Sequence, residues 1–62
     1  MAVTYVKPGV SITVEPSDTD VVVVTREGCH APRVEHCPAG DPAGLAAGIC
    51  RCLLDDGYSL AA

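Results

Sequence analysis

The chain has 62 residues and a formal net charge of −4, from four basic and eight acidic residues. A chain of this length forms one domain at most and buries only about 60% of the surface that its unfolded form exposes. The four basic side chains form no stripe, which argues against binding to nucleic acid or to an anionic membrane surface through phosphate neutralisation.

The core available to this chain is poor, because the sequence has two Tyr, no Phe and no Trp. Val, Leu, Ile and Ala must fill it, and they bury less area per residue than aromatic side chains. Small domains of this kind usually gain stability from a metal, from disulfides or from association. We therefore expect at least one of the three here.

Residues 1–27 have the pattern of β-strands. Val3–Val6 is short and rich in β-formers, and Val10–Glu15 alternates apolar with polar residues. Val21–Arg26 is a continuous β-branched run, typical of a strand covered on both faces. The sequence predicts a three-stranded antiparallel β-meander over residues 1–27, and the alternative is that Val3–Val6 is a frayed arm.

Residues 28–40 show no periodicity, and Pro32 and Pro38 prevent a helix of any length. We expect a loop, called the Cys/His loop here because of its four candidate ligands, Cys29, His30, His36 and Cys37.

Residues 41–57 predict a helix, because Asp41 can cap its start, Pro42 suits the first helical position and Gly57 is a natural stop. The alternative ends the helix near Gly48 and makes residues 50–60 a hairpin. Residues 58–62 form a short tail. The expected fold is thus a single small α+β domain over residues 1–62, with a β-meander, a Cys/His loop and one C-terminal helix.

Four cysteines and two histidines are candidate ligands for a structural zinc ion, which takes four thiolates or imidazoles in a tetrahedron. We predict zinc held by Cys29, Cys37, Cys50 and Cys52, with His30 and His36 as alternates. The spacing is not that of a standard zinc finger. Two disulfides, or free thiols that act as small hydrophobes, are the alternatives. A long helix would place Cys50 and Cys52 about 200° apart, too far for one ion.

Catalysis by a Cys–His dyad would pair Cys29 with His36, or His30 with Cys37. The sequence has no Asn or Gln to orient such a pair, no glycine-rich oxyanion turn and little length for a cleft. We therefore expect no enzyme and no small-molecule substrate.

The stretch AVTYVKPGV, residues 2–10, resembles the opening of contractile phage tail sheath proteins, where a short extended arm precedes the first domain. The resemblance covers nine of 62 residues, and the rest of the chain departs from that family. It implies a small virion or phage-encoded accessory protein.

The expected function is a non-enzymatic structural or interaction module stabilised by a Cys/His zinc site. The alternative is an accessory subunit of a larger assembly, such as a phage capsid or tail, with core thiols or disulfides and no metal. Either one implies a protein partner or a homo-oligomer. The start of the chain lacks the pattern of a secretory signal, and its longest apolar run is too short to cross a membrane. We therefore expect an intracellular protein, or one incorporated into a virion.

Overall fold

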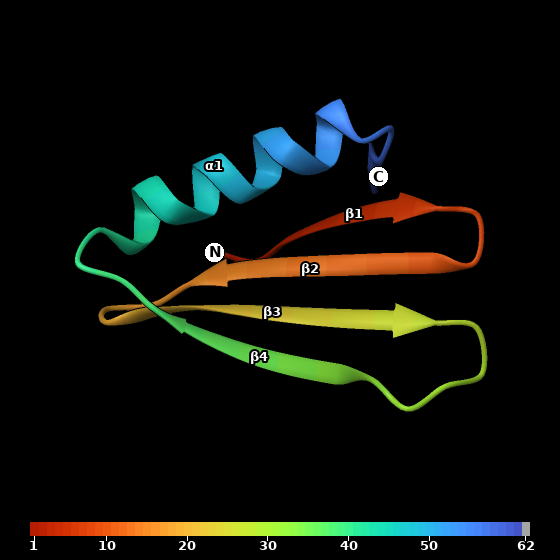
Figure 1. Cartoon of the computed structure of the whole chain (residues 1–62), viewed down its shortest axis with the longest axis horizontal. Helices are drawn as coiled ribbons and strands as arrows, with labels where there is room; N and C mark the ends of the chain where they lie inside the picture. Colours follow the sequence, from red (N-terminus) through yellow and green to blue (C-terminus); the bar gives the residue numbers. More distant parts are fainter. Residues whose placement is uncertain (62) are drawn as a thin grey trace.

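The computed structural model describes residues 1–61, which form one antiparallel sheet and one helix (Figure 1). The strands lie in the order β4-β3-β2-β1-β5, and every neighbouring pair is antiparallel. This confirms the small α+β domain with an antiparallel sheet. The elements in chain order are β1 (Val3–Lys7), β2 (Val10–Pro16), β3 (Asp20–Glu27), β4 (Arg33–Pro38), α1 (Pro42–Asp55) and β5 (Ser59–Leu60).

The predicted number of strands, three, is wrong, because the described chain has five. The first addition is β4, which occupies much of the segment expected to be a loop. Its residues show no apolar face, since five of the six are exposed and only Cys37 is half-buried. Pairing with β3 holds the strand, with Val21 opposite Cys37 and Val24 opposite Val34.

The second addition is β5, two residues of the expected tail that pair with β1. The backbone N–H of Ala61 donates to the Thr4 carbonyl at 2.9 Å, which extends this pairing by one position. Lys7 at the end of β1 lies 3.6 Å from the Asp56 carboxylate and 4.6 Å from the ring centre of Tyr58. These contacts join the end of the helix to this edge of the sheet.

The helix α1 begins and ends where its capping residues predict. The Asp41 carboxylate accepts a hydrogen bond from the Gly44 N–H at 3.2 Å, and Pro42 is the first helical residue. At the other end Gly57 has φ +96°, the left-handed conformation of a helix stop. The N–H groups of Gly57 and Tyr58 donate to the last-turn carbonyls of Leu54 and Leu53, a Schellman motif. The alternative hairpin over residues 50–60 is therefore not formed.

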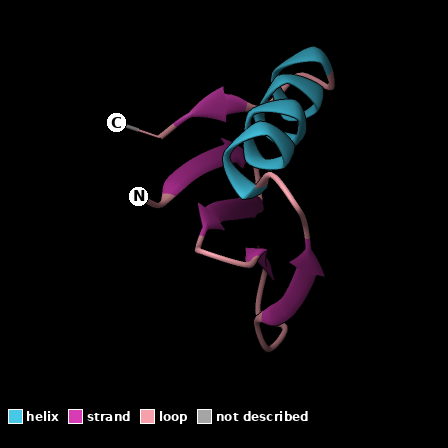
Figure 2. Cartoon of the chain, turned by 90° about the vertical axis from the view of Figure 1, so that its left-hand side faces the viewer, coloured by secondary structure: helices cyan, strands magenta, loops and turns pink. Residues whose placement is uncertain are grey.

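The helix α1 lies over one face of the sheet (Figure 2), and the core fills the space between them. Its buried members are Val14, Val21 and Ala46, and the half-buried side chains around them are Ile12, Val23, Cys37, Ile49, Cys50 and Leu53. The expectation that both faces of the Val21–Arg26 strand are covered is wrong, because α1 covers only one face of the sheet. Val22 and Val24 alternate with the core residues, point to the other face and stay half-buried. No helix of residues 1–61 is long and apolar enough to span a bilayer.

Candidate functional site

The four thiols lie in two different environments. Cys37 on β4 and Cys50 on α1 are half-buried and pack against the same core. Cys29, in the turn after β3, and Cys52, on α1, are exposed. The fold thus brings two of the predicted zinc ligands to one core and leaves the other two at the surface.

A tetrahedral site of four cysteines does not fit this arrangement. Because α1 continues to Asp55, Cys50 faces the core while Cys52 faces solvent. Over residues 1–61 no three Cys, His, Asp or Glu side chains form a group that could hold a metal ion. Both alternate ligands, His30 and His36, have exposed side chains. Zinc binding stays a prediction from the sequence, and the four-cysteine site would require the last turns of α1 to rearrange.

The half-buried Cys50 thiol affects the ionisation of a buried tyrosine. Tyr5 on β1 is buried, and hydrogen bonding with the Cys50 side chain, together with burial, raises the pKa of the Tyr5 hydroxyl above its ordinary value. Cys50 packs against the core, where a thiol serves as a small packing residue.

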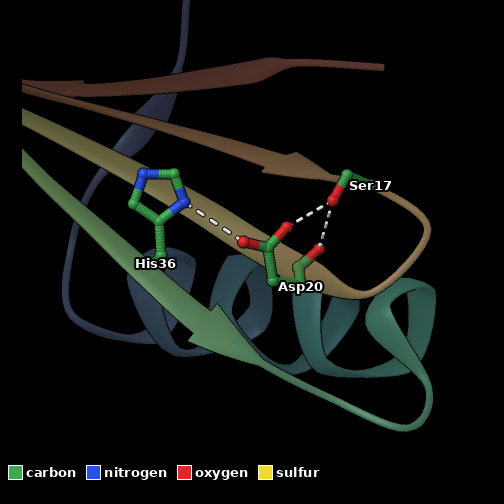
Figure 3. A network of polar contacts seen from close by, with 3 residues as sticks. All are labelled: Ser17, Asp20 and His36. Atoms are coloured by element: carbon green, nitrogen blue, oxygen red, sulfur yellow. Dashed lines mark hydrogen bonds and ion pairs between the residues drawn. The ribbon is translucent and has the colours of Figure 1, made fainter.

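Ser17, Asp20 and His36 form a polar network on the sheet face away from α1 (Figure 3). The Ser17 hydroxyl hydrogen bonds to the Asp20 carboxylate, and His36 Nδ1 lies 3.1 Å from Asp20 Oδ2. The hydrogen bond from Ser17, and then the one with His36, hold the pKa of the Asp20 carboxyl below its usual value. The network joins the β2–β3 turn to β4.

These three residue types also make up hydrolase triads, but the order of contacts here is different. In a triad the imidazole lies between the carboxylate and the hydroxyl and takes the proton of the hydroxyl. Here Asp20 lies in the middle, and Ser17 bonds to the carboxylate instead of the imidazole. The network therefore has the form of a structural link. Sequence reasoning missed it because the contact between Asp20 and His36 depends on the pairing of β3 with β4.

The outer edge of β4 presents free backbone groups. The Ala39 N–H donates to the Thr19 carbonyl at 3.1 Å, one position beyond the pairing of Asp20 with Pro38. Hydrogen-bonded pairs alternate along an antiparallel ladder, so odd-numbered residues of β4 bond to β3. The N–H and C=O groups of Val34 and His36 therefore point away from the sheet.

The side chains on β4 add charge to this edge. Arg33 and Glu35 lie on the side of the sheet that carries α1, with Arg33 Nε 3.6 Å from Glu35 Oε1. Both side chains are more than half exposed. Val34 lies on the opposite face and is 53% exposed. We call the outer side of residues 33–36 the edge site.

Comparison with family models, with curated proteins and with solved structures found no match to this chain.

Proposed function

We propose that the chain is a small, non-enzymatic interaction module that binds a protein partner by strand addition along β4. The observation that carries the proposal is the outward orientation of the Val34 and His36 backbone groups on an exposed strand. An extended segment that adds to a sheet edge gains main-chain hydrogen bonds, and adjacent side chains select it. A free sheet edge invites association, because its N–H and C=O groups have no partner within the sheet.

The prolines around β4 set the length of the edge site. Pro32 and Pro38 have no N–H, and they share the outward parity of Val34 and His36. The edge site thus offers two outward N–H donors in a row. This limits pairing to a short segment and favours a defined partner over open-ended sheet growth.

Of the two candidate modules, the environments of the thiols support the one without a metal. That candidate is an accessory subunit of a larger assembly. Cys37 and Cys50 pack in the core as apolar side chains do. A domain with so few buried residues gains stability from burial against a neighbour. The zinc-stabilised module remains the second candidate, on the strength of its six candidate ligands in the sequence.

The experiment selects peptides from a displayed random library against the immobilised protein and measures their affinity for two variants. Val34→Pro removes an outward N–H and leaves the bonds to β3 in place, whereas Val34→Ala changes the same side chain and keeps the N–H. The proposal expects selected peptides to bind wild type and Val34→Ala, and to lose binding to Val34→Pro. Equal binding to all three proteins, or no selected peptide, would refute it.

A further inference from the structure

The partner that the edge site fits most directly is a second copy of this chain. We infer that two copies pair antiparallel through β4, with Val34 opposite Val34 at the two-fold axis and Arg33 of each copy opposite Glu35 of the other. The inference rests on the proposed function, because it uses the same outward backbone groups, and it adds the identity and the register of the partner strand.

Symmetry restricts the registers that are possible. Two identical edges that extend one sheet are related by a two-fold axis perpendicular to it, so each face of one copy continues into the same face of the other. A shift by one residue would move every side chain to the opposite face, so registers differ by steps of two. A single residue of β4 therefore lies opposite itself in each allowed register.

The backbone groups of the edge site are satisfied in the proposed register. Val34 is an outward residue, so the two Val34 residues exchange N–H and C=O bonds across the axis. The outward N–H of His36 then faces the carbonyl of Pro32, just before β4 in the other copy. Pro32 needs no acceptor in return, because it has no N–H. Each outward donor of the edge site gains a partner.

The charged side chains favour this register over the registers shifted by two residues. With Val34 at the axis, Arg33 lies opposite Glu35 twice, in the closer type of cross-strand pair, where opposite charges stabilise. A shift in one direction puts Arg33 opposite Arg33, and a shift in the other puts Glu35 opposite Glu35. Like charges directly opposite are destabilising. A further shift puts His36 opposite itself and leaves both charges without an opposite partner.

The side chains are free to make these contacts. The relative exposure of Arg33 is 70% and that of Glu35 is 57%, and they contact each other only at 3.6 Å within one strand. On the other face Val34 is 53% exposed and lies beside Val24, so the two-fold contact covers apolar surface there. The pairing thus adds opposite charges on one face and apolar contact on the other.

The test uses sedimentation equilibrium, from micromolar to millimolar concentrations, on wild type, Arg33→Glu and Glu35→Arg. Each single variant places like charges opposite at both symmetric positions, and we expect its dimer dissociation constant to rise about tenfold or more. An equimolar mixture of the two variants restores both opposite-charge pairs, so it forms a heterodimer of wild-type strength. The double variant R33E/E35R restores them within one chain and dimerises like wild type.

Three outcomes would overturn the inference: a monomeric wild type at millimolar concentration, single variants that dimerise as strongly as wild type, or a mixture that stays as weak as its components. A dimer that is insensitive to both charges would point to the open sheet face instead. Circular dichroism confirms that each variant is folded. If wild type is monomeric but selected peptides still bind in a manner sensitive to Val34→Pro, self-pairing fails while strand addition stands. If the peptides also fail, the proposed function falls with it.

Discussion

The part of the sheet under α1 and the strand β4 are held in the fold in different ways. Under the helix, Val14 and Val21 are fully buried and Ala46 closes over them. β4 contributes one half-buried side chain, Cys37, and is otherwise held by its hydrogen bonds to β3 and by the contact of His36 with Asp20. The covered part therefore supplies most of the buried apolar surface, and β4 supplies the free edge on which the proposed strand addition depends.

The largest expected difference between the two regions comes from making the same Val→Ala substitution in each of them. Val21→Ala removes two methyl groups from a fully buried site, and we expect it to lower the free energy of unfolding by about 2–3 kcal/mol. Val34→Ala, at an exposed site, should change it by about 0.5 kcal/mol or less. Urea denaturation followed by circular dichroism measures both values. Equal losses would show that β4 carries as much stability as the core.

Two glycines of α1 test how the helix contributes to the stability of the covered part. A Cβ at Gly48 would meet nothing within 4 Å, so Gly48→Ala should raise the free energy of unfolding by up to about 1 kcal/mol. A Cβ at Gly44 would collide with the Asp41 carboxylate that caps the helix. Losing a cap costs about 1 kcal/mol, so Gly44→Ala should bring no gain. Thermal unfolding of the pair tests this, and equal stabilisation by both would contradict the role of the cap.

A smaller effect on stability is expected from Asp20, whose network with Ser17 and His36 joins the β2–β3 turn to β4. The pKa of Asp20 is lowered on folding from its ordinary value of 3.8, so its contribution is present above that value and is lost as pH falls through the folded pKa. Asp20→Asn should therefore be less stable than wild type at neutral pH, and the gap should close on acidification below the ordinary Asp value. Urea midpoints across acidic pH measure the gap, with the exposed Asp18→Asn as the control. A gap independent of pH would refute the assignment.

Zinc is expected to change neither the reactivity of the thiols nor the helix content. With chelator present, Cys29 and Cys52 should be alkylated before Cys37 and Cys50, because the first two thiols are exposed. Added zinc should leave both this order and the helical signal unchanged. Mass spectrometry of the alkylated chain reads the order. Protection of all four thiols at one zinc per chain would support the predicted four-cysteine site and show that α1 rearranges to form it.

The sequence predicted the parts of the fold that have a local signal. Alternation located β2, and the run of valines located β3. Asp41 and Gly57 located the ends of α1, because capping depends on a few adjacent residues.

β4 and the polar network could not be predicted in the same way. β4 has no apolar face, since it is exposed on both sides, so it lacks the period that marks a strand. The contact of His36 with Asp20 spans 16 residues and exists only once β3 and β4 pair. The helix period did predict that Cys50 and Cys52 lie on different sides of α1. In the structure Cys50 is half-buried and Cys52 is exposed.

Residue-resolved amide hydrogen exchange at low and high protein concentration tests the binding edge most directly. The Glu35 N–H bonds to β3 and should be protected at every concentration, whereas the Val34 and His36 N–H groups point outward. We predict that Val34 and His36 exchange freely in dilute protein and become protected as the concentration rises. Exchange of both that stays fast at every concentration would contradict pairing through β4.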